Sequence, residues 1–164
     1  MQQTVYKVIG VVLVLYSLIF GLLTSIPDLP IIEESIRNLF YHVSMWFAMV
    51  AMMAGSFAYS IVFLRRENLH ADRRTAALTE TGMLFAFLGL FTGMIWARFT
   101  WGAWWTNDPK LNGSAITILI YLAYFILRNG IEDQRKKARI SAVYNIFAFV
   151  MMIVFIGILP RMTD

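Results

Sequence analysis

The stretch LFYHVSMWFAMVAMMAGSFAYSIVFL, residues 39–64, decides the fold class. It contains no Asp, Glu, Lys or Arg, and it is longer than the ~20 residues that a helix needs to cross the hydrocarbon core of a bilayer. Backbone N–H and C=O groups in lipid must be hydrogen-bonded within the segment itself, which favours a helix. The sequence therefore predicts a membrane-spanning α-helix here.

Four more apolar blocks lie on either side of this stretch, at about residues 4–24, 81–97, 114–127 and 140–159. The chain is 59% hydrophobic and only 15% charged, with a mean hydropathy of +0.65, whereas soluble domains carry about 25% charged residues. We expect an all-α polytopic transmembrane helix bundle of five spans, forming a single domain over residues 1–164. The first span is expected to be retained, because no small-x-small cleavage pattern follows it.

Basic residues predict how the bundle is oriented. Ten of the fourteen Lys and Arg residues lie at the N-terminus or in the two connections around residues 65–80 and 128–139. Because short cytoplasmic loops are enriched in Lys and Arg, the N-terminus is expected to be cytoplasmic and the C-terminus outside. The net charge of +4 is thereby explained without nucleic acid as a partner. The run 132–139 is most simply an orientation signal, and contact with anionic lipid or a cytoplasmic subunit is the alternative.

The segment RFTWGAWWTNDPKLN, residues 98–112, holds three of the five tryptophans within five residues. One reading is an aromatic belt, since Trp favours the headgroup region. The other is a flat aromatic platform, made by Trp101, Trp104 and Trp105 with Gly102 between them, that stacks on a planar apolar ligand. On the predicted topology this segment lies at the outer face.

Charged residues flank this platform. Asp108 followed by Pro109 is typical of a helix N-cap and first helical position, which gives the carboxylate a structural role at the start of the fourth span. Arg98 and Lys110 are candidates to pair with anionic groups of a ligand, such as propionates. Anchoring at the interface is the alternative for both cations.

His42 lies near the predicted outer end of the second span, where an ionisable side chain usually faces the bundle interior or a cavity. It is either a hydrogen-bonded packing residue or a ligand, and neutral imidazole is a common ligand of haem iron. His70, the other histidine, falls in the basic connection and is expected to be solvated. Met45, Met49, Met52 and Met53 are predicted core-filling residues.

The sequence lacks features of an enzyme. It contains no phosphate loop, nucleophile elbow or paired-histidine zinc motif, so we expect no catalytic activity. It also contains no cysteine, which excludes disulfides, thiol nucleophiles and thioether attachment of a cofactor. The acidic residues Asp28, Glu33 and Glu34 of the first outer segment are expected to be solvated or to form a docking surface.

Three sequence elements together resemble a known family. They are RNLFYHV at residues 37–43, TGMIW at 92–96 and WGAWWTNDPKL at 101–111. Their order and spacing resemble the CcmC-type haem exporter subunits, members of the WWD-domain family of cytochrome c assembly proteins. The resemblance covers the chain from about residue 36 to the end of the fifth span.

This resemblance implies a protein of the bacterial inner membrane that binds haem b non-covalently and transiently at the outer face. It implies His42 as an axial iron ligand, and it implies a binding surface formed by the residues that match the motif, namely Trp101, Gly102, Trp104, Trp105 and Asp108, with Arg98 and Lys110 beside them. The implied partners are membrane lipid, a periplasmic haem chaperone that receives the haem for c-type cytochrome maturation, other membrane subunits and an ATP-binding subunit.

Two departures from the family pattern affect this expectation. Asn107 stands where the motif usually has a further Trp, so the platform is smaller and more polar at one edge. The second histidine that the family has after the fifth span is not found, and the sequence ends at residues 160–164, where that loop would begin. We therefore expect a truncated chain or a short variant of the family.

Two other functions compete with haem delivery. One is a structural membrane subunit of an ABC-type transporter without a haem site of its own, whose basic connections dock a nucleotide-binding subunit. The other is a membrane cytochrome b that carries electrons. Two histidines stacked across the bilayer would mark such a cytochrome, and the sequence does not contain them.

Overall fold

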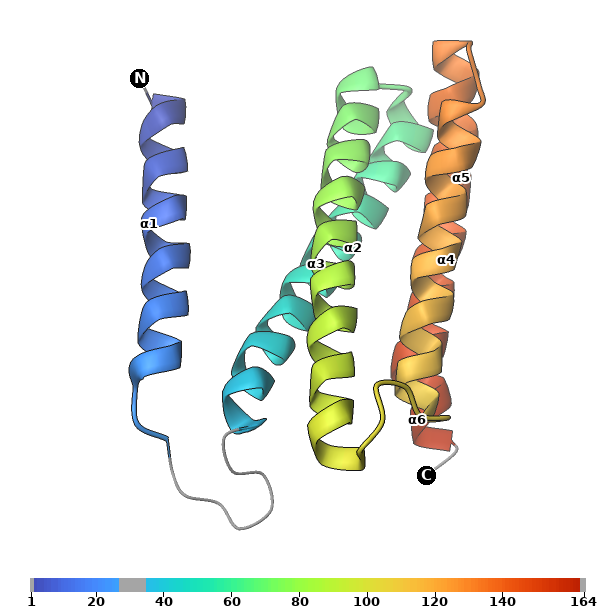
Figure 1. Ribbon diagram of the computed structural model, residues 1–164. Helices are drawn as coiled ribbons and strands as arrows, with labels where there is room; N and C mark the ends of the chain where they lie inside the picture. The colour runs from blue at the N-terminus through green and yellow to red at the C-terminus, as the bar shows by residue number, and fades with distance from the viewer. Residues whose placement is uncertain (1, 27–34, 163–164) are drawn as a thin grey trace.

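A computed structural model describes residues 2–26 and 35–162 of the chain (Figure 1). The helices are α1 (Gln2–Leu23), α2 (Ser35–Arg66), α3 (Leu69–Trp101), α4 (Pro109–Asn129) and α5 (Gln134–Met152). The last continues through a π-helical segment, η1 (Ile153–Ile158), into the short α6 (Leu159–Met162). The acidic residues Asp28, Glu33 and Glu34 lie outside the described residues.

Five of these helical segments are long and apolar enough to cross a membrane, as the hydropathy pattern predicts. They alternate in direction, so that the N-terminus and both basic connections lie at one end of the bundle, the upper end in Figure 1. The α3–α4 connection and the C-terminal end of the chain lie at the other end. We call these ends the basic end and the tryptophan end.

The third helix is much longer than its apolar block. The prediction that it begins near residue 81 is wrong, because the helix extends back to Leu69. The side chain of Asn68 caps it by accepting a hydrogen bond from the backbone N–H of His70 at 2.9 Å. Residues 69–80 are polar but rich in helix formers such as Ala, Leu, Arg and Glu, so they extend the helix without adding to its hydropathy. His70 is exposed on this extension, in agreement with its predicted solvation.

About half of the tryptophan segment is helical, so the predicted loop over residues 98–112 is too wide. Helix α3 continues to Trp101 and α4 begins at Pro109, which leaves only 102–108 irregular. Gly102 ends α3 with φ +77°, a left-handed conformation that glycine adopts without steric cost. Its N–H donates to the carbonyl of Arg98 at 3.1 Å. A linker over residues 102–108 therefore joins α3 to α4.

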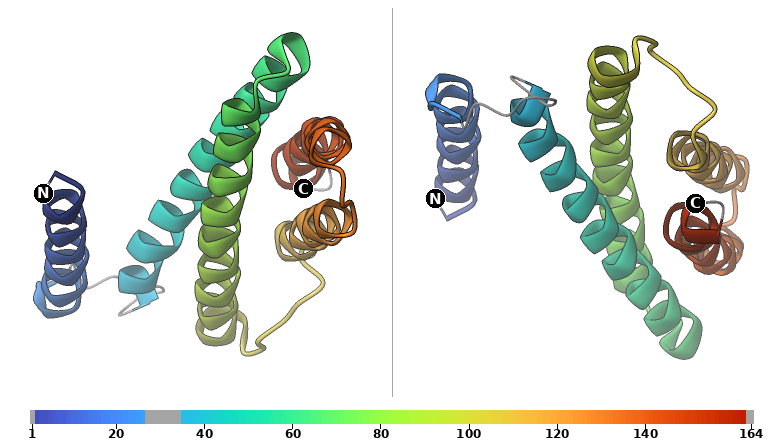
Figure 2. Two further views of the ribbon diagram at one scale, coloured as in Figure 1. Left: turned by 90° about the horizontal axis from the view of Figure 1, so that it is seen from above. Right: turned by 90° about the horizontal axis from the view of Figure 1, so that it is seen from below.

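Helix α1 stands beside the bundle rather than inside it (Figures 1 and 2). The start of α2 holds it through side chains: the Arg37 guanidinium donates to the carbonyl oxygens of Gly21 (3.0 Å) and Thr24 (2.6 Å). The Tyr41 hydroxyl donates to the carbonyl of Leu18 at 3.1 Å. The apolar side chains of α1 are otherwise exposed along its length, as expected for a helix surrounded by lipid.

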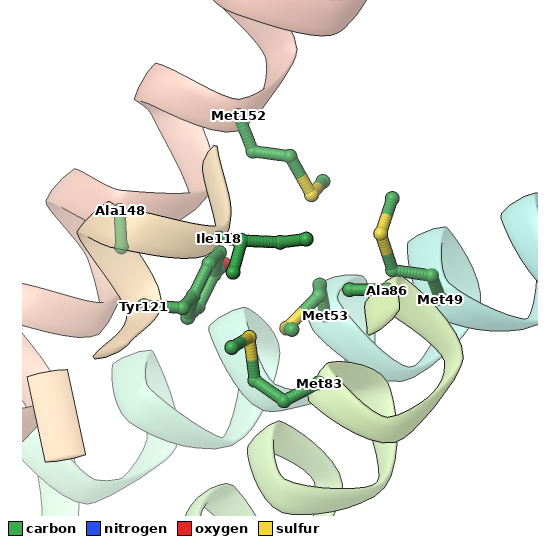
Figure 3. Packing of buried hydrophobic residues seen from close by; sticks show 8 residues of the cluster. All are labelled: Met49, Met53, Met83, Ala86, Ile118, Tyr121, Ala148 and Met152. Carbon is green, nitrogen blue, oxygen red and sulfur yellow. The ribbon is translucent and has the colours of Figure 1, made fainter. Parts of the chain in front are cut away.

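Methionines fill the centre of the bundle between α2, α3, α4 and α5 (Figure 3). Their flexible thioethers fit the irregular space between crossing helices. This confirms the predicted core role for Met49 and Met53, which are buried. The residues of the cluster are Met49, Met53, Met83, Ala86, Ile118, Tyr121, Ala148 and Met152.

A buried ion pair joins α3 to α4 toward the basic end. Both terminal guanidinium nitrogens of Arg128 donate to the Asp72 carboxylate, at 2.7 and 2.8 Å, and the Arg128 and Asp72 side chains are only 13% and 2% exposed. The sequence reading of Arg128 as a loop charge is therefore wrong. A residue in the last turn of α4 can face the neighbouring helix. Its charge can then be buried there, because it pairs with a carboxylate that is buried with it.

Candidate functional site

A pocket with a volume of about 440 Å³ lies at the tryptophan end. Helices α2, α3 and α4 and segment η1 all contribute to it. Its wall is mainly apolar and aromatic, with a few polar groups, as is typical of small-molecule sites. The lining residues are His42, Val43, Trp46, Phe47, Val50, Gly89, Leu90, Gly93, Trp96, Trp101, Asp108, Lys110, Leu111, Ser114 and Ile156.

His42 is held in one tautomer. Its Nδ1 lies 2.9 Å from the carbonyl oxygen of Gly89 and 3.1 Å from the Thr92 hydroxyl. Because a carbonyl oxygen can only accept, Nδ1 carries the proton and donates it to Gly89. The other ring nitrogen, Nε2, then keeps its lone pair. A neutral imidazole oriented through Nδ1–H to a backbone carbonyl is the usual arrangement of a metal-ligating histidine.

Small residues on α3 make room for this imidazole. A Cβ atom added at Gly93 would lie 2.9 Å from Cε1 of His42, whereas one added at Gly89 would lie 3.6 Å from the nearest atom, on Trp46. Atoms at 2.9 Å overlap, since carbon contacts are optimal near 3.5–4.0 Å. Gly93 therefore allows the α3 backbone to approach the ring closely, and the ring orientation depends on it.

Two tryptophans meet at the pocket wall. The rings of Trp96 and Trp101 pack edge to face, with centroids 5.6 Å apart and planes at 66°. The indole N–H of Trp96 is buried and has no hydrogen-bond partner within the described residues. A buried indole N–H usually finds an acceptor, so this donor is an unsatisfied polar group behind the pocket wall.

Asp108 stabilises the start of α4 as the sequence predicts. Its Oδ1 accepts from the backbone N–H groups of Lys110 (2.8 Å) and Leu111 (3.1 Å), and Pro109 is the first helical residue. The carboxylate thus lines the pocket while serving as the N-cap. Asn107, which departs from the motif, accepts a hydrogen bond from Asn112 at 2.9 Å and ties the linker to the same helix.

The structure brings together half of the predicted site residues. His42, Trp101, Asp108 and Lys110 line one pocket. The other four are absent from its lining. Arg98 donates to the carbonyl of Gly102, Trp105 donates to Asn112 at 3.2 Å, and Trp104 is 54% exposed.

Sequence reasoning missed the α3 wall of the pocket, chiefly Gly93 and Trp96. Both belong to the TGMIW element at 92–96, which was used for the resemblance but not for the site. Trp46, one helical turn after His42, also lines the pocket. No binding role was assigned to it from the sequence. A glycine in a span is compatible with close helix approach, but the sequence does not say which neighbouring side chain it faces.

The donor set of the pocket fits haem. An imidazole with a free Nε2 suits the iron, the aromatic and apolar wall suits the macrocycle, and the Lys110 ammonium is a partner for a carboxylate. The fold and the pocket together define a polytopic membrane protein with a histidine- and tryptophan-lined ligand site at one end of its helix bundle.

Comparison with known proteins assigns the family. The chain matches the CcmC family, heme exporter protein C, over residues 1–157. It is 33% identical over 110 residues to heme exporter protein C of Bradyrhizobium diazoefficiens, a match covering 66% of this chain and 41% of that protein. The corresponding protein of Escherichia coli is 24% identical over 110 residues, covering 67% and 45%.

A related protein also matches, the cytochrome c biogenesis protein CcsA of Prochlorococcus marinus. It is 35% identical over 98 residues, which are 60% of this chain and 30% of that protein. These three matches each span less than half of the relative's length. The chain belongs to the heme exporter protein C family, which confirms the resemblance carried by its three sequence elements.

Proposed function

We propose that this protein binds haem at the tryptophan end of its bundle and presents it for the maturation of c-type cytochromes. The observation that carries the proposal is His42, whose Nδ1–H is held by the Gly89 carbonyl at 2.9 Å while the ring lines an aromatic pocket. With Nδ1 occupied in this way, Nε2 would be free to ligate the iron of a bound haem. The name of one relative, heme exporter protein C, supports haem as the cargo, and the name of another, cytochrome c biogenesis protein, supports the role in cytochrome maturation.

In this proposal different residues of the pocket contact different parts of the haem. Trp46, Trp96 and Trp101 contact the macrocycle, and Lys110 pairs with a propionate. Haem b is held without a covalent bond, because the chain has no cysteine for a thioether. Trp104 and Trp105, which do not line the pocket, contact the exposed edge of the haem or the protein that receives it.

We also propose that the tryptophan end faces outward from the bacterial inner membrane. The two basic connections, with ten of the fourteen Lys and Arg residues counting the N-terminus, lie at the opposite end, and positive charge favours the cytoplasmic side. A periplasmic haem chaperone would then meet the exposed tryptophans. Other maturation subunits and an ATP-binding subunit complete the proposed assembly.

A haem titration of the purified protein tests the proposal. Wild-type protein in detergent is expected to give a ligated Soret band, and His42→Ala is expected to shift that band and weaken binding at least about tenfold, as for loss of a metal ligand. His70→Ala is the matched control, because that exposed histidine lies at the basic end. An unchanged spectrum and affinity in His42→Ala would refute the assignment and leave a structural transporter subunit as the better reading.

A further inference from the structure

A second pocket, at the basic end, has no part in haem binding. It has a volume of about 200 Å³ and lies where the end of α2 and the start of α3 meet the start of α5. We call it the basic pocket. Its lining residues are Phe63, Glu67, Leu69, Arg135, Lys136 and Arg139.

Positive charge in the basic pocket exceeds what the protein itself neutralises. The pocket lining contains three cations, Arg135, Lys136 and Arg139, and one carboxylate, that of Glu67. Arg139 forms an ion pair with Glu67, with a long N–O distance of 3.6 Å. Both partners are largely exposed, at 73% and 64%, so the pair contributes little. Within residues 2–26 and 35–162, neither Arg135 nor Lys136 forms a salt bridge. Two cations of the pocket are therefore available to an external anion.

The N-terminus of α5 is not the source of this site. Asp133 already caps that helix, accepting from the backbone N–H of Lys136 at 2.7 Å. The capping carboxylate already occupies the position at the positive end of the helix dipole where an external anion would bind. The attraction for an anion comes from the side chains of Arg135, Lys136 and Arg139.

Below the charges, the pocket and its surroundings are hydrocarbon. Phe63 is buried in a small apolar cluster with Ala71, Ala138 and Ala142. Along α5, Val143 follows Arg139 by four residues, which places both on one face of the helix. Val143 is 56% exposed and Ile140 is 45% exposed. A charged rim thus passes directly into a surface that faces lipid.

We propose that the basic pocket binds the phosphate headgroup of an anionic phospholipid, whose acyl chain lies along the Val143 face of α5. A lipid uses both parts of the surface, the cations and the adjoining hydrocarbon, whereas free phosphate uses only the first. Basic pockets between membrane helices bind such headgroups in other proteins. The site would fix the basic end at the membrane boundary, independently of haem.

Native mass spectrometry of the full chain released from nanodiscs tests this inference. Discs contain phosphatidylcholine with a graded fraction of phosphatidylglycerol, and retained lipid is counted per protein. The variant Arg135→Gln/Lys136→Gln is expected to lose phosphatidylglycerol retention about tenfold, since each nearby Lys or Arg strengthens binding to anionic lipid several-fold. Retention of phosphatidylcholine should not change. Arg135→Lys should keep most of the binding.

The matched control is Arg65→Gln/Arg66→Gln, which removes the same charge from exposed residues at the same end outside the pocket. Equal loss in the two double variants, or no loss in either, would overturn the proposal, because attraction would then be unspecific or absent. Inorganic phosphate or glycerol phosphate that binds as tightly as the lipid would also overturn it, in favour of a soluble anion. Circular dichroism verifies that each variant remains helical.

Discussion

Replacing Gly93 with Ala should weaken haem binding while leaving the helix bundle intact. The added Cβ would lie 2.9 Å from Cε1 and 3.5 Å from Nδ1 of His42. Relief of this overlap requires the ring to move by about 0.6 Å or more toward normal contact. The ring cannot move freely, because its Nδ1 is hydrogen-bonded to Gly89 at 2.9 Å on the same helix.

The size of the effect follows from these contacts. Overpacking of this kind costs about 1–3 kcal/mol, and a strained hydrogen bond costs up to about 1 kcal/mol. If about 1–2 kcal/mol is lost from the bound state, haem affinity falls roughly 5- to 30-fold. The Soret band should also shift, because the displaced Nε2 ligates iron less well.

A haem titration of purified Gly93→Ala, followed by absorbance, measures both effects. Gly89→Ala is the control, since it adds the same methyl group one turn away, on a residue that lines the same pocket, at an ordinary 3.6 Å from its neighbour. Its affinity should change by less than about twofold, as expected for a substitution without overlap. Equal affinities and spectra for Gly93→Ala and Gly89→Ala would refute the claim that Gly93 sets the position of His42.

Three further substitutions test the scaffold around the pocket. Asp72→Asn should destabilise the bundle by about 3–5 kcal/mol in a denaturation assay in micelles, because Arg128 is left buried without its carboxylate. Adding Arg128→Met in the same chain should recover much of the loss, and no recovery would contradict this explanation. Asn145→Ala removes hydrogen bonds of 2.8 and 2.9 Å to two serines of α2 and should lower stability by about 0.6–1.7 kcal/mol; no loss would mean that these bonds do not stabilise the bundle. Asp108→Ala should lower the free energy of unfolding by about 1 kcal/mol through loss of the N-cap. Asp108→Ser, which keeps a capping oxygen, should retain both stability and haem affinity. Weak haem binding by Asp108→Ser would show that the carboxylate itself contacts the ligand.

The sequence predicts the elements of this fold better than their contacts. The five spans follow from hydropathy, and the cap at Asp108 followed by Pro109 follows from local turn chemistry. The extent of α3 does not, because residues 69–80 are helical but polar and hydropathy detects only the part of a helix that is apolar. Hydropathy shows whether a segment lies in lipid or in water, and it does not show whether the backbone is helical.

The pocket could be predicted only in part, for a different reason. A histidine is unusual in a membrane span, and three tryptophans within five residues are unusual in a connection between spans, so each feature draws attention by itself. The role of Gly93 and the pairing of Arg128 with Asp72 depend on which helix faces which, and on how closely the axes approach. Those facts are set by the packing of whole helices, which no local pattern in one chain specifies.

The most direct test of the central claim is to detect the bond between His42 and iron. The chain has only two histidines, so protein labelled with ¹⁵N-histidine and loaded with ferric haem can be examined by pulsed electron paramagnetic resonance. We predict a ¹⁵N hyperfine coupling to the iron in the wild type and in His70→Ala, and its loss in His42→Ala. A histidine coupling that persists in His42→Ala, or none in the wild type, would contradict the proposed haem site.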